Sequence, residues 1–446
     1  MKRGYLVGLA ALLQCLGASA NGRFPLAQQL VVAPKDPNSL ALRSTFGLVL
    51  SKDGGKNWHW VCEQAIGYSG VEDPALGVTQ GGALIAGIFD GLRRGDPKGC
   101  DFTFPDPQLK DRYAVDVTVD KTDPRIVYVL TSTGKGGGNF ETLLWRSSDE
   151  GVTFNQLGSA LPEAFLGLTL DPAPSDPNRI YVSGLGSGSA GLLYATNDAG
   201  QSWQSFTVPS ADIQNSPFIG AVSPTDPLRV YLRIAGSQTN RLLLTDDGGQ
   251  SFTEIFAGTG RMLGFALSPS GDEVTIGYGD PKGGAVVDPQ TLGLWHAKTS
   301  DHVFTRVHEG PVNCLTWTSQ SLYVCGSQFE QGFELGRVDA PSLGGGSVDF
   351  TPVFRLDDVQ GPAPCPSGSG TESLCTSAWP ALCELLGRCT DAGSGGADGG
   401  DAGPDAPPAP EPGDCNCIAV GRRVRLPSWI FAIPLAFLLG RRRRHR

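Results

Sequence analysis

Four short segments of this sequence each contain an acidic turn that could bind a metal ion or a polar substrate. They are "SKDGGKNW" (51–58), "SSDEGVTF" (147–154), "TNDAGQSW" (196–203) and "TDDGGQSF" (245–252). One active site is rarely repeated four times along a chain, whereas a structural unit is. In such a turn the aspartate accepts backbone N–H groups, the glycine supplies positive φ, and the aromatic ring anchors the loop. We therefore predict a hairpin role for Asp53, Gly55, Trp58, Asp149, Gly151, Phe154, Asp198, Gly200, Trp203, Asp247, Gly249 and Phe252.

The closing aromatic recurs beyond these segments and sets the number of repeats. With degenerate copies included, seven positions lie 44 to 52 residues apart: Trp58, Phe102, Phe154, Trp203, Phe252, Phe304 and Phe350. This spacing is typical of propeller blades. The segments "LGLTL", "RIYVSG", "GLLYATN" and "SWQSF" predict four short strands in one repeat. We expect an all-β, seven-bladed propeller over residues 21–360, in which Asp-Pro pairs at 36, 123, 176 and 226 form turns.

The segments also resemble a known repeat. Their pattern, S/T-x-D-x-G-x-S/T-W/F, is similar to the Asp-box, or BNR repeat, of sialidases, sortilin-type receptors and related β-propellers. The box at 94–102 carries an extra residue, and the segments ending at Phe304 and Phe350 lack the aspartate pattern. In a propeller of this strand order the Asp boxes lie on one face. The remaining loops, where function usually resides, lie on the opposite face.

Enzymatic activity is harder to predict than the fold. A sialidase needs three arginines, a tyrosine nucleophile with a glutamate partner, and a carboxylic acid/base. Arg23, Arg112 and Arg261 are candidate arginines, but the tyrosine–glutamate pair has no evident counterpart and a sialidase has six blades. The sequence also lacks H-E-x-x-H, G-x-S-x-G and a phosphate-binding loop. We predict no cofactor, no metal site and no catalytic residues.

Our main interpretation is a non-enzymatic binding or display module for a glycan, a protein or an envelope component. The alternative is a glycoside hydrolase, sialidase-like or degrading another polysaccharide, that uses carboxylates on the loop face. The candidate residues on this face are Arg112, Arg261, Glu72, Asp73, Asp111, Glu163 and Asp212. The same carboxylates are equally consistent with a solvated surface.

The two ends of the chain indicate export and anchoring. Residues 1–20 combine Lys2 and Arg3 with an apolar run and Ala18-Ser19-Ala20, as in a secretory signal peptide. Residues 361–390 are rich in cysteine, and residues 391–413 form a low-complexity linker. Residues 414–446 resemble a MYXO-CTERM sorting signal, with a cysteine motif, a hydrophobic stretch and an arginine-rich end. The resemblance implies processing near Cys415 or Cys417 by a membrane protease and attachment at the cell surface.

Charge and cysteine content agree with an exported protein. Ten of the 35 basic residues lie in the signal peptide and after residue 420, which leaves 25 against 45 acidic residues and a net charge near −20. This surface disfavours nucleic acid as a partner. Eight remaining cysteines suggest four disulfides. We expect Cys62–Cys100, Cys314–Cys325 across a hairpin, and pairs among Cys365, Cys375, Cys383 and Cys389.

Overall fold

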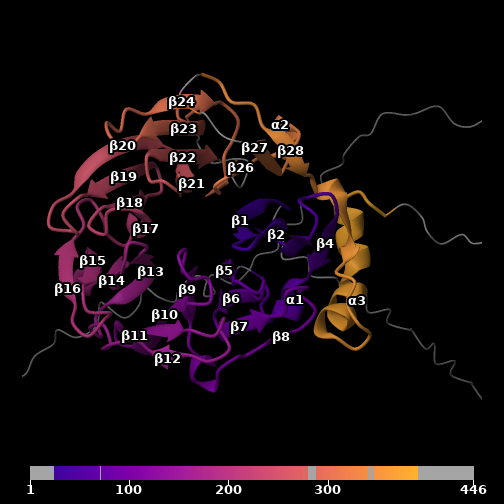
Figure 1. The fold of residues 1–446 in the computed structure, drawn as a ribbon, viewed down its shortest axis with the longest axis horizontal. Coiled ribbons are helices and arrows are strands. Elements are labelled where there is room, and N and C mark those ends of the chain that lie inside the picture. The colour runs from indigo at the N-terminus through magenta and orange to yellow at the C-terminus, as the bar shows by residue number, and fades with distance from the viewer. Residues whose placement is uncertain (1–24, 71, 280–287, 340–342, 344–345, 390–446) are drawn as a thin grey trace, which may run out of the picture. The chain divides into compact units, whose positions relative to one another are not determined.

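The computed structural model describes residues 25–70, 72–279, 288–339, 343 and 346–389, and these residues form a seven-bladed β-propeller. Each blade is an antiparallel sheet of four consecutive strands, and the first blade gains a fifth strand from the C-terminal side. Figure 1 shows the first strands of the blades near the centre of the ring and the fourth strands at its rim. The predicted fold class and number of blades are therefore confirmed.

The first four blades contain sixteen strands. Blade 1 consists of β1 (Ala27–Ala33), β2 (Asp36–Ser44), β3 (Gly47–Ser51) and β4 (Trp58–Val61). Blade 2 consists of β5 (Ala75–Val78), β6 (Leu84–Ile88), β7 (Gly91–Gly95) and β8 (Phe102–Thr103). Blade 3 consists of β9 (Ala114–Val119), β10 (Val127–Gly136), β11 (Asn139–Ser147) and β12 (Asn155–Gln156). Blade 4 consists of β13 (Leu166–Ala173), β14 (Asp176–Leu185), β15 (Gly191–Thr196) and β16 (Gln204–Thr207).

Three further blades and three helices complete the described chain. Blade 5 consists of β17 (Ser216–Val222), β18 (Val230–Ala235), β19 (Thr239–Thr245) and β20 (Thr253–Thr259). Blade 6 consists of β21 (Arg261–Leu267), β22 (Glu273–Gly279), β23 (Gly293–Lys298) and β24 (Thr305–His308). Blade 7 consists of β25 (Cys314–Trp317), β26 (Ser321–Cys325), β27 (Leu335–Asp339) and β28 (Thr351–Phe354). The strand that joins blade 1 is β29 (Val359–Pro362), and the helices are α1 (Glu63–Ile66), α2 (Gln328–Gln331) and α3 (Gly370–Leu385).

The hydrophobic pattern follows the position of a strand within its blade. Middle strands such as β6 are buried along their whole length, because neighbouring blades cover both faces of the sheet. Fourth strands such as β16 are mostly exposed at the rim. All seven closing aromatics lie at the first residue of a fourth strand or directly before it. Each aromatic therefore marks one blade, and their number predicts the number of blades.

Side chains on the inner strands connect neighbouring blades. The Oδ2 atom of Asp116 on β9 accepts a hydrogen bond from the Leu170 amide on β13, at 2.8 Å. Asp171 on β13 accepts one from the Val222 amide on β17 in the same way, at 3.1 Å. Burial raises the pKa of Asp116 to about 7, and the charge of Asp171 adds to this effect. Burial also raises the pKa of Asp171.

Each of the four Asp boxes forms a hydrogen-bonded hairpin. Asp198 Oδ1 accepts from the Thr196 hydroxyl (2.6 Å) and the Ser202 amide (2.9 Å), while the Ser202 hydroxyl donates to Oδ2. Gly200, with φ of 86°, donates its N–H to Thr196 Oγ1. Hydrogen bonds from the side chains of Ser202 and Thr196 lower the pKa of Asp198 to about 2. The same arrangement surrounds Asp53, Asp149 and Asp247, with Gly55, Gly151 and Gly249 as donors.

The box of blade 1 also fastens this blade to blade 7. Trp58 is fully buried, and its indole N–H donates to Gly55 O (2.9 Å) and to Val353 O on β28 of blade 7 (3.2 Å). The degenerate box of blade 2 uses Asp96, whose carboxylate accepts from the backbone amides of Lys98, Cys100 and Asp101. These carboxylates stabilise their own turns, in agreement with the hairpin role predicted for the boxes.

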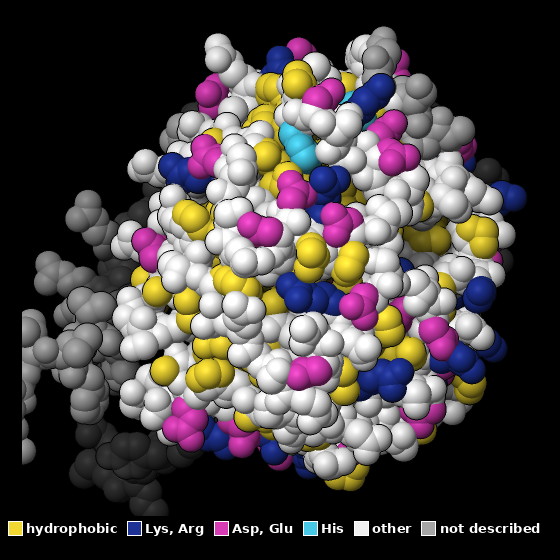
Figure 2. Space-filling model, turned by 60° about the vertical axis from the view of Figure 1, so that its left-hand side comes forward, with side chains coloured by type: hydrophobic (Ala, Val, Ile, Leu, Met, Phe, Trp, Pro, Cys, Tyr) yellow, Lys and Arg dark blue, Asp and Glu magenta, His cyan; other side chains and the backbone are white. Residues whose placement is uncertain are grey.

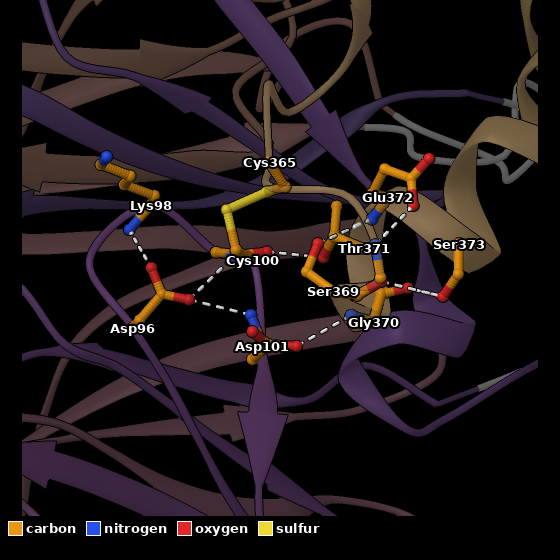
Figure 3. The surroundings of a disulfide bond; sticks show 12 residues. Asp96, Lys98, Cys100, Asp101, Cys365, Ser369, Gly370, Thr371, Glu372 and Ser373 are labelled. Atoms are coloured by element: carbon orange, nitrogen blue, oxygen red, sulfur yellow. Dashed lines mark hydrogen bonds between the residues drawn. A yellow bond between two sulfur atoms is a disulfide. The ribbon is translucent and has the colours of Figure 1, made fainter.

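The C-terminal cysteine-rich segment packs on the propeller. β29 pairs in parallel with β4, and α3 lies beside blade 1, where Trp379 and Trp60 have ring centroids 6.0 Å apart. Two disulfides join this segment to the ring, Cys62–Cys375 and Cys100–Cys365. Figure 3 shows the second disulfide, next to which the Thr371 hydroxyl donates to Gly99 O at 2.6 Å.

The predicted cysteine pairing was therefore partly wrong. The Cys62–Cys100 bridge does not form, because α3 places Cys375 with its Cα 5.3 Å from that of Cys62. Cys365 and Cys375 pair with the propeller and not with each other or with Cys383 and Cys389, which form their own bridge. The Cys314–Cys325 bridge is present, across the paired strands β25 and β26.

The ends of the chain lie outside the described residues, including the signal peptide, Arg23, Cys415, Cys417 and the hydrophobic tail. Within the part that the structure describes, no helix is long and apolar enough to cross a membrane.

Candidate functional site

The loop face between blades 2 and 3 brings together several of the predicted site residues. The β6–β7 turn carries Phe89, and the connection from blade 2 to blade 3 carries Asp111, Arg112 and Tyr113. Glu72 belongs to the connection from blade 1 to blade 2. Because neighbouring strands are antiparallel, these connections lie at the end of the blades opposite to the Asp boxes.

Two aromatic side chains form the centre of this group. Phe89 is 48% exposed and Tyr113 is 38% exposed, and their ring centroids lie 4.6 Å apart with the rings nearly perpendicular. An edge-to-face pair of this kind is a favourable arrangement of aromatic rings. The pair presents a large apolar surface to solvent, of the type that stacks against planar or ring-shaped ligands. We call Phe89, Tyr113 and Glu72 the aromatic–acid site.

Glu72 lies at the edge of the aromatic pair. Its Oε2 atom accepts a hydrogen bond from the Phe89 amide at 3.1 Å. Partial burial raises the pKa of Glu72; the hydrogen bond from Phe89 opposes this effect, and the charge of Asp90 adds to it. The pKa of Tyr113 is raised as well, by burial and then by the charge of Glu72. A carboxyl group with a raised pKa beside aromatic rings has the character of a general acid.

Further carboxylates surround the aromatic–acid site. Asp111 has φ of 61° and donates its amide to Asp90 O at 2.8 Å, so the two residues lie on adjacent turns. Both side chains are exposed. Asp73 follows Glu72 directly in the chain and is also exposed. An acid with a second carboxylate near it is the minimum set for hydrolysis of a glycosidic bond.

Arg112 is held in an ion pair and is not aimed at a ligand. Its Nη1 atom binds Glu141 Oε2, its Nε donates to Gln108 O at 2.9 Å, and Lys135 Nζ lies 3.4 Å from Glu141 Oε1. Partial burial acts to raise the pKa of Glu141, but the hydrogen bond and charge of Arg112, with Lys135, lower it overall. Arg112 directly precedes Tyr113 in the chain, so the ion pair borders the aromatic–acid site.

Two of the remaining predicted residues lie on other blades: Asp212 accepts hydrogen bonds from Gln214 and Asn215 within its own turn, and Arg261 is the exposed first residue of β21. Glu163 is exposed on the connection from blade 3 to blade 4, where its backbone O accepts a hydrogen bond from the Phe140 amide at 2.7 Å. The structure thus groups Glu72, Asp111 and Arg112, with Glu163 on the far side of blade 3. In the described ranges, no cluster of three or more metal-ligating side chains is found.

Phe89, Tyr113 and Glu141 were not among the site residues predicted from the sequence. The segment "IFDG" at 88–91 offered a signal, because an aromatic in a two-residue hairpin turn has no core to enter. Tyr113 carried no such signal, because its exposure depends on where the connection between blades 2 and 3 passes over the face.

Comparisons with known proteins support the fold. The family described as sortilin, neurotensin receptor 3 (Sortilin-Vps10) matches residues 142–282, which contain three of the four Asp boxes. A xyloglucanase of Hypocrea jecorina (strain QM6a) is 27% identical over 157 residues, or 35% of this chain and 14% of the xyloglucanase. The chain therefore resembles a small part of that enzyme.

Solved structures were compared with this chain as well. An ancestral GH74 enzyme superposes with a TM-score of 0.56 at 14% identity, covering 75% of this chain and 47% of the enzyme. The GH74 enzyme of Niastella koreensis gives a TM-score of 0.42 at 13% identity, with 73% and 65% of the two chains covered. At this identity the likeness to the ancestral enzyme establishes the propeller fold. The chain spans about half the length of that enzyme.

Proposed function

We propose that this propeller binds a polysaccharide chain on its loop face and hydrolyses it at the aromatic–acid site. The observation that carries the proposal is the exposed Phe89–Tyr113 pair with the carboxyl group of Glu72 at its edge. Aromatic faces stack on sugar rings, and the raised pKa of Glu72 keeps a larger fraction of this carboxyl protonated. The partial matches to a xyloglucanase and to GH74 enzymes support a glucan as the substrate.

In the proposed reaction, Glu72 donates its proton to the oxygen of the glycosidic bond as that bond breaks. Asp90 or Asp111 serves as the second carboxylate, either as the base that takes a proton from the attacking water or as the nucleophile. The Arg112–Glu141 pair fixes the loop from which Asp111 and Tyr113 project. All of these groups come from blades 2 and 3, apart from Glu72 on the connection that leads into blade 2.

The test is release of reducing sugar from xyloglucan, cellulose and mixed-linkage glucan. We expect E72Q to lower hydrolysis by about 100-fold or more, the usual contribution of a general acid. Because the reaction needs protonated Glu72, activity should decline as pH rises through the raised pKa. The matched control is E163Q, which removes an exposed carboxylate elsewhere on the same face and should leave the rate unchanged. Equal losses in both variants, or full activity in E72Q, would contradict the assignment.

A second candidate function is polysaccharide binding without hydrolysis. The Phe89 amide donates a hydrogen bond to Glu72, just as turn amides donate to the aspartates of the Asp boxes. This similarity favours a structural role for Glu72. In this case F89A and Y113A weaken retention on insoluble glucan, while wild-type protein releases no reducing sugar from any of the three substrates.

We also propose that the protein acts at the cell surface, after export by the signal peptide and sorting through the segment 414–446. Support comes from the resemblance of this segment to a MYXO-CTERM signal and from the four disulfides within the described residues. A C415S/C417S variant should fail to be processed and should be lost from the surface fraction. Unchanged processing and surface labelling of this variant would refute the sorting proposal.

A further inference from the structure

A polar groove of about 530 Å³ opens on the Asp-box face, between blade 7 and blade 1. It is remote from the aromatic–acid site, which lies on the loop face. The groove is lined by Asn38 and Gly54 from blade 1 and by Thr318, Gln320, Arg337 and Asp339 from blade 7, with Val32, Pro37, Ser319, Ser321 and Tyr323 completing its wall. We call it the seam groove.

The equivalent position between blades 2 and 3 is filled by a carboxylate of the protein itself. Glu150 directly follows the aspartate of its Asp box and reaches back to the β5–β6 turn of blade 2. There its Oε2 atom accepts a hydrogen bond from the Thr79 hydroxyl at 2.7 Å and from the Gly81 amide at 2.6 Å. The Thr79 hydroxyl in turn accepts from the Ala83 amide, at 3.1 Å. At the seam, the contact between these two neighbouring blades, the β5–β6 turn thus binds a carboxylate.

Blade 7 presents a similar turn to blade 1. Thr318 directly follows β25, as Thr79 directly follows β5, and its hydroxyl accepts from the Ser321 amide at 3.0 Å. The Asp-box residue that faces this turn is Gly54, which follows Asp53 just as Glu150 follows Asp149. Gly54 supplies no carboxylate to this turn. The Thr318 hydroxyl donates to Ser321 O at 3.0 Å, and the Gln320 amide donates to Thr318 Oγ1 at 3.3 Å.

The other groups in the seam groove suit a sugar. Arg337 and Tyr323 are directly paired across β27 and β26, so their side chains lie on the same face of the sheet. Arg337 forms an ion pair with Asp339 (2.9 Å), which also accepts from the Ser321 hydroxyl. The hydroxyl and amide groups of Ser319, Gln320 and Asn38 match the hydroxyl groups of a saccharide. The volume accommodates a ligand of one or two sugar units.

We propose that the seam groove binds a sugar unit that carries a carboxylate, a uronate residue, with the carboxylate at the turn of Thr318 and Gln320. The carboxylate of the ligand then takes the place that the Glu150 carboxylate has between blades 2 and 3. Its ring hydroxyls contact the polar wall of the groove, which includes the Arg337–Asp339 ion pair.

The first test compares D-glucuronate with D-glucose as probes, using calorimetric titration of the intact protein. We expect saturable binding of glucuronate and at least tenfold weaker binding of glucose. G54E should weaken glucuronate binding at least tenfold, because it places a carboxylate in the groove from within the chain. Glu150 has φ of 60° at the position where Gly54 has φ of 75°, so a glutamate occupies this backbone conformation elsewhere in the chain; at Gly54 the added Cβ lies 3.0 Å from the Asn38 side chain, which has to shift.

The matched control is A199E, which adds a glutamate at the same Asp-box position of blade 4 and should bind glucuronate as the wild type does. Thermal unfolding confirms that G54E is folded. Equal affinity of the wild type and G54E, equal affinity for glucose and glucuronate, or no binding of glucuronate would each overturn the proposal.

A second measurement tests the comparison between the two seams. E150A removes the internal carboxylate, and we expect acetate to restore more of its thermal stability than chloride does at the same ionic strength. If acetate and chloride act alike on E150A, the turn does not select a carboxylate and the argument for the seam groove fails.

Discussion

Asp116 and Asp198 show how position in the propeller sets the chemistry of one residue type. Asp116 lies on an inner strand, where burial raises its pKa to about 7. Asp198 lies at the surface, where donors from Ser202 and Thr196 lower its pKa to about 2. Glu72 is intermediate, partly buried against Phe89 and Tyr113 with a raised pKa. In these three residues burial raises the pKa of the carboxyl group and hydrogen-bond donors lower it.

The pKa of Asp116 predicts a pH dependence of stability. The folded protein holds a proton on Asp116 that the unfolded chain releases above about pH 4. The stabilisation is therefore complete below pH 4 and is lost as pH rises through 7. D116N keeps an oxygen acceptor for the Leu170 amide but cannot ionise. Between pH 5 and 8 the free energy of unfolding of the wild type should therefore fall by about 2 kcal/mol more than that of D116N. Urea denaturation of both proteins measures the difference, and parallel pH curves would contradict it.

At the scale of elements, the segment of β29 and α3 closes the ring. In this propeller the first blade is built from its own four strands, and the last strand is added outside it, parallel to β4. Cys62–Cys375 spans 313 residues and Cys100–Cys365 spans 265, so both bridges join distant parts of the chain. By contrast, Cys314–Cys325 spans 11 residues within one hairpin.

This difference predicts unequal contributions of the disulfides to stability. In C62S/C375S the Cys100–Cys365 bridge still joins the two segments, so Cys62–Cys375 closes an effective loop of only about 50 residues, for which loop-closure entropy gives roughly 4 kcal/mol, against roughly 3 kcal/mol for the hairpin bridge. We expect C62S/C375S to lower the melting temperature more than C314S/C325S does. Calorimetry of the two double variants measures this, and limited proteolysis should cut α3 first in C62S/C375S. Equal melting temperatures would show that α3 does not close the ring.

At the scale of the whole molecule, charges of both signs are interspersed. On the face in Figure 2, Lys and Arg side chains lie beside Asp and Glu, and hydrophobic side chains are scattered in small groups. Ion pairs such as Arg229–Asp246 and Arg241–Glu254 lie on blade 5. The excess of acidic residues acts over long range, and we expect it to disfavour the binding of nucleic acid, whereas recognition of a ligand depends on local groups.

The sequence predicted the blades because the Asp box is a local structure. Its hydrogen bonds link residues two to four positions apart, so a short sequence motif is enough to predict the geometry of the hairpin turn. The cysteine pairing was not predictable in this way, because Cys62 and Cys375 meet only after the ring has closed.

The candidate site was predicted in part for the same reason. Strand order placed Glu72, Asp111 and Arg112 on the loop face, and the structure groups them. The exposure of Phe89 and Tyr113, and the capture of Arg112 by Glu141, depend on how separate loops pack together. Charge and spacing in the sequence do not contain that information.

The most direct test of the central claim is a crystal structure of E72Q with a xyloglucan oligosaccharide. We predict a sugar ring stacked on the Phe89–Tyr113 pair, with the glycosidic oxygen of the next linkage within hydrogen-bonding distance of the amide group that replaces the Glu72 carboxyl. An oligosaccharide bound elsewhere on the propeller, with the aromatic pair uncovered, would contradict the assignment of the aromatic–acid site.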